Sequence, residues 1–359
     1  MSDALANGLA GAGGGIIAQI ITYPLQTMIT RQQTERSKKK DKPLQRTSTI
    51  VQILQVIENE GLRGLYSGFT PSLLGTAVSQ GVYYYFYQIF KNRAEKYAAS
   101  KKAKGRGDGS IGMFSWLVVA ALAGSLNVLL TNPIWVIVTR MQTQAQAVMK
   151  IDEGKKKLLL MDEASKENAE LQTLEAEIPS NSKRKATPYG TIEAVQDVYN
   201  ESGVPGFWKG LVPTLIMVCN PSIQFMIYET SLKHLNSKRQ KRSSEKATAM
   251  EVFLLGAVAK MGATLGTYPL LVVKSRLQAK QVIGGSSSLR YSGTIDAIGK
   301  IIRHEGLSSF YKGMGAKIVQ SVFSAAVLFM IKEELVKMFL LFPSRTNRML
   351  FKTTNQNDL

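Results

Sequence analysis

The sequence predicts an all-α membrane protein built from three copies of one two-helix repeat. Six apolar stretches are each about long enough to cross a bilayer, which takes roughly 20 residues of helix. Two short motifs recur three times in the same order. Charged segments alternate with the apolar stretches, so the mean hydropathy of −0.03 for the whole chain conceals them.

The six apolar stretches are rich in glycine, alanine and serine, and each contains scattered polar residues. They cover residues 5–30, 70–90, 112–139, 211–232, 250–273 and 315–340. Small and polar residues suit helices packed closely around a wet interior better than single spans in lipid. The segments between them, such as 101–110 and 233–246, carry too many charges to be buried. A soluble all-α protein is the alternative.

The composition limits the classes of function. A formal net charge of +19 predicts anionic partners: nucleic acid, lipid headgroups or anionic solutes. The single cysteine, Cys219, excludes an intramolecular disulfide framework. No nucleophile–base pair or phosphate loop is visible, so we expect neither an enzyme nor a cofactor, and no metal site. The charged segments lack interleaved aromatic residues, which together with six spans counts against nucleic acid.

The first recurring motif lies near the end of each odd-numbered stretch. It reads TYPLQTMITRQQ at 22–33, TNPIWVIVTRMQ at 131–142 and TYPLLVVKSRLQ at 267–278. Its prolines are Pro24, Pro133 and Pro269, and every copy ends on an arginine followed two residues later by a glutamine. A proline inside a helix removes a hydrogen bond and kinks the span. We therefore expect three kinked helices that converge and close one end of the bundle.

The second motif follows downstream as EGLRGLYSG at 60–68, SGVPGFWKG at 202–210 and EGLSSFYKG at 305–313. The second copy lies farther from its proline than the others do. The extra residues fall in the polar segment 143–188, which we interpret as an inserted loop that could include a short amphipathic helix. The predicted repeats are residues 1–110, 111–246 and 247–342, followed by a polar tail at 343–359.

Both motifs resemble those of the mitochondrial carrier family, and the likeness covers nearly the whole chain. It implies six transmembrane helices in three pseudo-symmetric pairs around a central cavity, with a short surface helix on the inner side of each pair. It also implies a monomer in membrane lipid that works by alternating access. The segments NPIWV at 132–136 and NPSIQFMIYE at 220–229 are similar to the peroxisomal branch of the family.

That branch implies exchange of NAD for AMP, ADP or CoA in the peroxisomal membrane. Alternative substrates are ATP/ADP, FAD, folate or CoA, and the alternative location is the mitochondrial inner membrane. A non-transport role in which the basic segments bind lipid or nucleic acid is a further alternative.

In this family, ion pairs between acidic and basic positions of the first motif close the cavity on the inner side. Here the acidic positions hold Gln26, Trp135 and Leu271, and the basic positions hold Ile29, Val138 and Lys274. No complete ion pair can form at these positions. We therefore expect closure through apolar contacts, the Trp135 ring and hydrogen bonds from Gln26.

The resemblance implies an outer gate on the even-numbered helices. Its positions hold Gln88 with Lys91, Glu229 with Leu232, and Glu333 with Val336. Two acids and one base remain, so at least one pair between helices can form. The alternative is that these are ordinary charges at helix ends.

The resemblance also implies mid-cavity contacts at Gly75, Ile216 and Gln320. Further candidates for substrate contact are Gln19, Thr76, Ser79, Tyr83, Met217, Asn220, Lys317 and Ser321. A small Gly75 leaves room for a flat base, Ile216 offers an apolar wall, and Lys317 can reach a phosphate. Tyr83 can stack on a ring, although packing is the ordinary role of most aromatics in its run. Asn220 could instead satisfy backbone groups at a kink before Pro221.

Lys260 is the sharpest polar signal, because it lies inside an apolar stretch at a position where the other repeats have Gly15 and Gly124. A lysine near the middle of a membrane is costly unless it faces water or an anion. We expect Lys260 to contact the substrate; the alternative is a lysine that extends to an interface.

Replacing Lys260 tests this expectation. We predict that Lys260→Ala abolishes transport but not membrane insertion, because an anionic substrate would lose its buried cation. The measurement is uptake by reconstituted protein, and unchanged uptake by the variant would contradict the prediction.

Overall fold

The computed structural model describes residues 3–36, 48–103, 112–161, 189–240, 248–279 and 291–324, with a few positions up to 334. All regular elements in these ranges are helical, which confirms the all-α prediction. The predicted tail at 343–359 and the outer-gate residue Glu333 lie outside the described residues.

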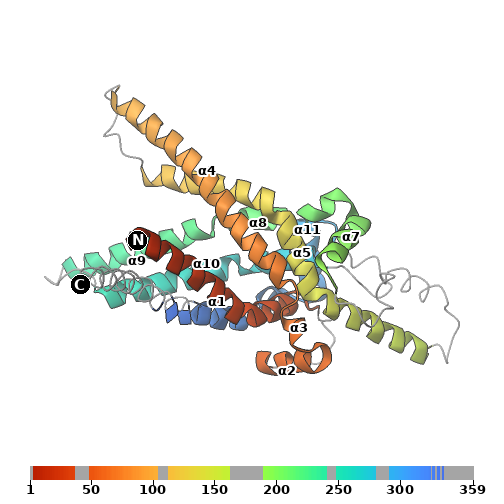
Figure 1. Ribbon diagram of the computed structural model, residues 1–359. Helices are drawn as coiled ribbons and strands as arrows, with labels where there is room; N and C mark the ends of the chain where they lie inside the picture. Colours follow the sequence, from red (N-terminus) through yellow and green to blue (C-terminus); the bar gives the residue numbers. More distant parts are fainter. Residues whose placement is uncertain are drawn as a thin grey trace, which may run out of the picture. The chain divides into compact units, whose positions relative to one another are not determined.

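The long helices follow the predicted apolar stretches (Figure 1). They are α1 (Asp3–Thr34), α4 (Phe69–Ala103), α5 (Met113–Met161), α8 (Leu211–Met217) with α9 (Asn220–Gln240), α10 (Ala249–Gln278) and a helix over 314–324. The short elements are α2 (Thr49–Glu60), α3 (Leu62–Leu65), α7 (Thr191–Ser202), η2 (Val204–Trp208), α11 (Thr294–His304) and η4 (Leu307–Tyr311).

The chain divides into two compact units. The first comprises Met1–Ile29, Gln45–Ser67 and Gly313–Leu359; the second comprises Thr30–Leu44 and Gly68–Lys312. Within the second unit α4 packs along α5, and α9 along α10 (Figure 1). The structure differs from the predicted loop at 143–188, because α5 continues as one helix to Met161. The rest of that segment, 162–188, lies outside the described residues.

Among the described residues, three helical segments are long and apolar enough to cross a membrane. They are Met113–Val148, Val204–Ser237 and Met250–Gln278. The second of these is broken between α8 and α9, just before Pro221, which cannot donate a backbone hydrogen bond. The arrangement of six spans stays a prediction.

Each motif proline leaves a carbonyl that a side chain of the second motif can satisfy. Proline has no N–H, so the carbonyl four residues earlier loses its helical partner. In the first repeat this is the carbonyl of Ile20, which accepts a hydrogen bond from the Tyr66 hydroxyl at 3.3 Å. In the second repeat the Trp208 indole N–H donates to the carbonyl of Leu129 at 2.9 Å. In these two repeats the aromatic residue of the second motif therefore bonds the carbonyl that the proline of the first motif leaves without a helical partner.

The glycines of the second motif are required by the backbone. All six have a positive φ, between 63° and 87°: Gly61, Gly68, Gly203, Gly210, Gly306 and Gly313. Residues with a Cβ rarely adopt this conformation. The first glycine of each pair follows a surface helix. The second precedes the next helix along the chain, which is α4, α8 or the helix over 314–324. The repeated spacing is therefore a repeated turn.

The residue just before each motif proline ties the long helix to that turn. It donates a hydrogen bond from its side chain to the carbonyl preceding the second glycine. The three bonds run from Tyr23 to Ser67 at 3.0 Å, from Asn132 to Lys209 at 3.3 Å and from Tyr268 to Lys312 at 2.9 Å. The asparagine of the second repeat thus replaces a tyrosine with the same partner position.

The surface helices α2 and α11 bury one face against a long helix of their own unit. In the first unit Val56 of α2 packs with Met28 and Leu65. In the second, Ile301 of α11 packs with Val273 and Leu277 of α10. These clusters hold the short helices beside the ends of the long ones.

The turn geometry predicts that Gly210→Ala destabilises the fold. A left-handed φ costs a residue with a Cβ about 1–3 kcal/mol. The added carbon would also lie 3.1 Å from Gln278 Cγ and 3.3 Å from the Lys274 carbonyl oxygen. The melting temperature in detergent should fall. Gly81→Ala is the matched control, since Gly81 lies inside α4 with no atom within 4 Å of the added carbon. An equal effect of both variants would contradict the explanation.

Candidate functional site

A closed ring of hydrogen bonds joins the three first motifs within the second unit. The arginine of each repeat donates through Nε to the backbone carbonyl of the next repeat's glutamine. The bonds are Arg31 to Gln142, Arg140 to Gln278 and Arg276 to Gln33, each 2.9 Å long. All six residues are buried. We call this set the arginine–glutamine ring.

Helix ends explain why arginine is used in this ring. The last carbonyls of a helix have no partner within it, and the C-terminal end of the helix dipole favours a cation. Gln33 and Gln278 stand at the ends of α1 and α10, so the arginines that reach them satisfy such carbonyls. Gln142 differs, because α5 continues past it.

The glutamine side chains strengthen two of the three contacts in the ring. Gln33 accepts a hydrogen bond from the Ser275 hydroxyl at 2.7 Å and donates to the Tyr268 hydroxyl at 3.2 Å. Gln278 makes the equivalent contacts: it accepts from Thr139 at 3.2 Å and donates to Asn132 at 3.4 Å. Each glutamine therefore bonds the residue before the arginine and the residue before the proline of the neighbouring repeat.

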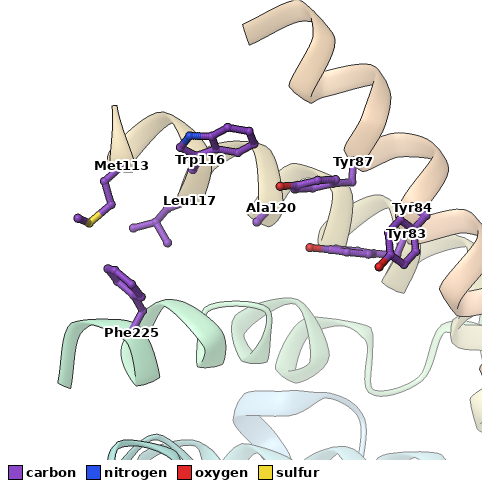
Figure 2. A pocket seen from close by; sticks show the side chains of 8 residues that line it. All are labelled: Tyr83, Tyr84, Tyr87, Met113, Trp116, Leu117, Ala120 and Phe225. Carbon is purple, nitrogen blue, oxygen red and sulfur yellow. The ribbon is translucent and has the colours of Figure 1, made fainter. Parts of the chain in front are cut away.

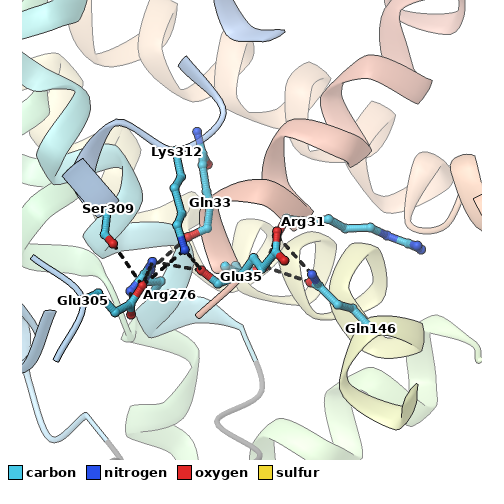
Figure 3. A network of polar contacts seen from close by, with 9 residues as sticks. Arg31, Gln33, Glu35, Gln146, Arg276, Glu305, Ser309 and Lys312 are labelled. Carbon is cyan, nitrogen blue, oxygen red and sulfur yellow. Dashed lines mark hydrogen bonds and ion pairs between the residues drawn. The ribbon is translucent and has the colours of Figure 1, made fainter. Parts of the chain in front are cut away.

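Glu305 holds the arginine of the third repeat from the other side (Figure 3). Both of its carboxylate oxygens contact Arg276, with a second bond of 3.0 Å from Nη2 to Oε2. Lys312 Nζ lies 3.4 Å from the same carboxylate and 3.1 Å from the Glu35 carbonyl oxygen, which Arg276 also reaches. The bidentate pair and its neighbours leave little of either charge without a partner.

Glu201 plays the same part in the second repeat, where it forms ion pairs with Arg140 and, at 2.8 Å, with Lys209. The motif comparison points to Ser202 as the acidic position, so sequence reasoning missed this residue by one place. Burial alone would raise the pKa of Glu201, but Arg140 and Lys209 outweigh it and hold the pKa below its usual value.

The inner-gate positions form no ion pair among the described residues. Ile29 and Val138 are fully buried, as apolar contact would require. Trp135 lies between α5 and α4, where its indole N–H donates to the Ser79 hydroxyl at 3.3 Å. Leu271 and Lys274 are half-buried on α10. The expectation that closure rests on apolar contacts, Trp135 and Gln26 omitted the arginine–glutamine ring.

The predicted cavity residues of the second unit do not all lie together. A carbon added to Gly75 would meet Ile134 at 3.0 Å and Trp135 at 3.7 Å. The expectation that Gly75 leaves room for a base is therefore wrong for this conformation, because α5 fills that space. Thr76 bonds its own helix, at the carbonyl of Ser72.

On α8 and α9, Ile216 is exposed and Met217 half-buried. Asn220 donates to Thr267 Oγ1 at 2.6 Å and to the Ala263 carbonyl at 3.3 Å, and so joins α9 to α10. These partners belong to α10 and not to the break before Pro221, so both roles expected of Asn220 stay predictions.

In the first unit, Lys317 donates to the buried Gln320 at 2.9 Å, and Ser321 bonds the Lys317 carbonyl at 2.8 Å. Gln19 and Gln26 are half-buried on α1. The substrate roles of these residues stay predictions.

Lys260 is exposed, and its ammonium makes no hydrogen bond or ion pair with the described residues. The ammonium of the half-buried Lys274 likewise makes no hydrogen bond or ion pair with the described residues. Gly124, at the position equivalent to Lys260, is packed so tightly that an added carbon would lie 2.8 Å from Val218. Gly15, the third equivalent residue, has no atom that close. The three positions thus differ in their surroundings, and Lys260 also differs from the two glycines in residue type.

The described outer-gate charges pair along their own helices. Lys91 lies 3.8 Å from Glu95, and Glu229 lies 3.9 Å from Lys233. Gln88 bonds Asn92 at 3.2 Å. The expected pair between helices is therefore absent from the part of the gate that the structure describes.

Three sequence repeats, long apolar helices and charges buried at helix ends define a multi-pass helical membrane protein. A family model described as mitochondrial carrier protein matches residues 2–98, 170–239 and 245–342. The chain belongs to the mitochondrial carrier family.

Three relatives match almost the whole chain. The peroxisomal nicotinamide adenine dinucleotide carrier of Arabidopsis thaliana is 61% identical over 94% of this chain and 96% of its own length. Peroxisomal membrane protein PMP34 of Mus musculus is 31% identical over 93% and 92%. The chloroplastic folate transporter 1 of Arabidopsis thaliana is 29% identical over 94% and 96%.

The Arg140–Glu201 pair generates a stability prediction. Glu201→Gln should lower the free energy of unfolding by about 3–5 kcal/mol, because it leaves a buried guanidinium without its anion. Tryptophan fluorescence during heating in detergent measures the loss. Since the carboxylate stabilises the fold only while ionised, the gap between wild type and variant should narrow as the pH falls below about 4.3.

Lys233→Gln is the control, because its side chain is 78% exposed and its pair with Glu229 follows one helix. Such pairs contribute about 0.5 kcal/mol or less. A loss no larger in Glu201→Gln than in this control would show that Glu201 does not hold Arg140.

Proposed function

We propose that this chain is a multi-pass carrier of the peroxisomal membrane that exchanges NAD for AMP, ADP or related adenine nucleotides, with CoA as a further counter-substrate. The observation that carries the proposal is 61% identity over almost the full length of both chains to a peroxisomal carrier of NAD. The likeness to a second peroxisomal membrane protein supports the location.

The mechanism is alternating access. Six spans form three pairs around a central cavity, in a monomer surrounded by lipid. The arginine–glutamine ring supports a conformation closed on the inner side, because it ties the ends of α1 and α10 to the middle part of α5. Passage of substrate then requires the ring to open and an outer gate to close.

This closure needs no complementary charges between neighbouring motifs. The family's inner gate pairs acids with bases, whereas this ring joins arginines to backbone carbonyls. A hydrogen bond from a charged donor contributes about 1.5–3 kcal/mol. Three such bonds are strong enough to hold the gate closed and weak enough to break when it opens. The carbonyl is present whatever side chain stands there. The substitutions Gln26, Trp135 and Leu271 at the acidic positions are therefore compatible with a working gate.

Two lysines of α10 suit an anionic substrate. Lys260 and Lys274 are 14 residues apart, which places them on nearly the same helix face, about 21 Å apart along the axis. Neither ammonium has a partner among the described residues, and a lysine in a spanning helix is costly without water or an anion. Phosphate groups of a nucleotide would supply the missing anions during transport.

A carrier of another nucleotide-like anion, namely ATP/ADP, FAD, folate or CoA, in peroxisomes or mitochondria, is the second candidate. The likeness to a chloroplastic folate transporter favours it specifically. Folate, FAD and NAD all combine flat rings with negative charge, so the lysines of α10 would serve each of them.

The test uses purified protein in liposomes preloaded with AMP, ADP, ATP, NAD, CoA or folate. We expect labelled NAD to enter liposomes that contain AMP or ADP, and to enter empty liposomes far more slowly. No exchange of NAD with any nucleotide would contradict the proposal. A strong preference for ATP/ADP or folate would favour the second candidate.

A further inference from the structure

An aromatic pocket of about 530 Å³ opens between α4, α5 and α9, within the second unit (Figure 2). Its lining includes Tyr83, Tyr84, Tyr87, Trp116, Leu117 and Phe225. The volume lies within the range of small-molecule sites, roughly 300–1,000 Å³. Of these residues, the sequence analysis singled out Tyr83.

The rings of the pocket form a stacked column. The Tyr83 and Tyr87 rings lie 5.8 Å apart and 20° from parallel, and the Tyr87 and Trp116 rings lie 6.3 Å apart and 28° from parallel. Phe225 of α9 lines the pocket as well, and in Figure 2 it lies below Met113 and Leu117 of α5. The small side chain of Ala120 leaves the space open. A flat ring can enter there with aromatic groups on more than one side.

The pocket lies beside a row of α4 residues that contact α5. Gly75, Ser79, Tyr83, Tyr87 and Lys91 follow one another at four-residue intervals on α4, and the row is about 24 Å long. The inner end of this row contacts Trp135 of α5, and its outer end lies beside Trp116. This row is therefore the contact between α4 and α5, and the pocket lies where that contact opens toward Phe225 of α9.

The chemistry of the pocket favours a cationic ring over a lipid chain. Three tyrosines and a tryptophan line it, and an acyl chain gains nothing from the tyrosine hydroxyls. The faces of tyrosine and tryptophan attract cations, as in the aromatic cages that bind quaternary ammonium groups. The nicotinamide ring of oxidised NAD is flat and carries a positive charge.

One cation of the protein already lies near the pocket: the Lys91 ammonium is 5.6 Å from the centre of the Trp116 ring. It also lies 3.8 Å from the Glu95 carboxylate, which offsets its charge. Tyr83 lies about two turns of α4 before Lys91, so the Tyr83 end of the pocket is the end open to a second cation.

We propose that the aromatic pocket binds the nicotinamide ring of the substrate and so lets the carrier distinguish a dinucleotide from the same molecule without that ring. The inference rests on the proposed function and adds a place for one end of the substrate. The phosphates would then lie toward the lysines of α10.

ADP-ribose provides the test, because it has the adenine, both riboses and both phosphates of NAD but lacks the nicotinamide. In proteoliposomes preloaded with AMP, we expect Trp116→Ala to raise the half-saturation concentration for NAD about 5- to 100-fold, the usual effect of losing one stacked ring. Uptake of ADP-ribose should be unchanged, and Trp116→Phe should keep most of the affinity for NAD.

Two further variants keep the result interpretable. Tyr87→Leu removes a ring but keeps an apolar side chain, and it should act like Trp116→Ala if that variant fails to insert. Phe114→Ala is the matched control, since Phe114 lies on α5 like Trp116, is 78% exposed and does not line the pocket. The uptake of NAD and of ADP-ribose should be unchanged in this variant.

A direct readout is the part of the tryptophan fluorescence that Trp116→Phe removes. NAD should quench that part, and ADP-ribose should not. Equal losses for NAD and ADP-ribose would overturn the proposal, as would an unchanged preference. Quenching of the same signal by brominated lipid chains that NAD does not relieve would show that lipid fills the pocket. In each of these cases NAD exchange by the wild type would still stand, so failure here is distinct from failure of the proposed function.

Discussion

Three buried arginines, one from each copy of the first motif, constrain the rest of the structure. Arg140 and Arg276 are only 1% and 2% exposed, and Arg31 is 5% exposed. A buried guanidinium is costly unless its donors are satisfied and its charge is paired. The next repeat supplies a carbonyl through its glutamine, and in the second and third repeats the surface segment supplies a glutamate. The recurrence of arginine and glutamine in the first motif follows from that need.

The second motif follows from the same constraint. Glu305 and Glu201 can reach their arginines because a short helix ends beside the long one and the chain turns sharply there. The positive φ of glycines such as Gly306 makes that turn. The aromatic residue that follows satisfies, in the first two repeats, the carbonyl that the proline exposes. Proline, glycine, aromatic residue and arginine therefore form one unit that is repeated three times.

Much of this scaffold could be predicted from the sequence, because it depends on residues with restrictive chemistry. The repeated spacing of proline and glycine is enough to predict where the kinks and turns lie, because three matching copies are improbable by chance. Partners across helices could not be predicted in the same way. Glu201 precedes the aligned acidic position, and nothing local shows that Arg140 turns toward it. The space beside Gly75 depends on how closely α5 approaches, and the helix through 143–161 extends a span into a polar segment.

We infer that the arginine–glutamine ring closes the inner side and has to open during each transport cycle. Thr139 and Gln278, whose side chains bond across two repeats at 3.2 Å, are the places to test it. The measurement is exchange by a Thr139→Cys, Gln278→Cys double variant that also carries Cys219→Ala, before and after a short bifunctional thiol reagent. The account predicts that cross-linking stops exchange and that reduction restores it, while the single-cysteine variants keep their activity under the same treatment. Full exchange by the cross-linked protein would contradict the account.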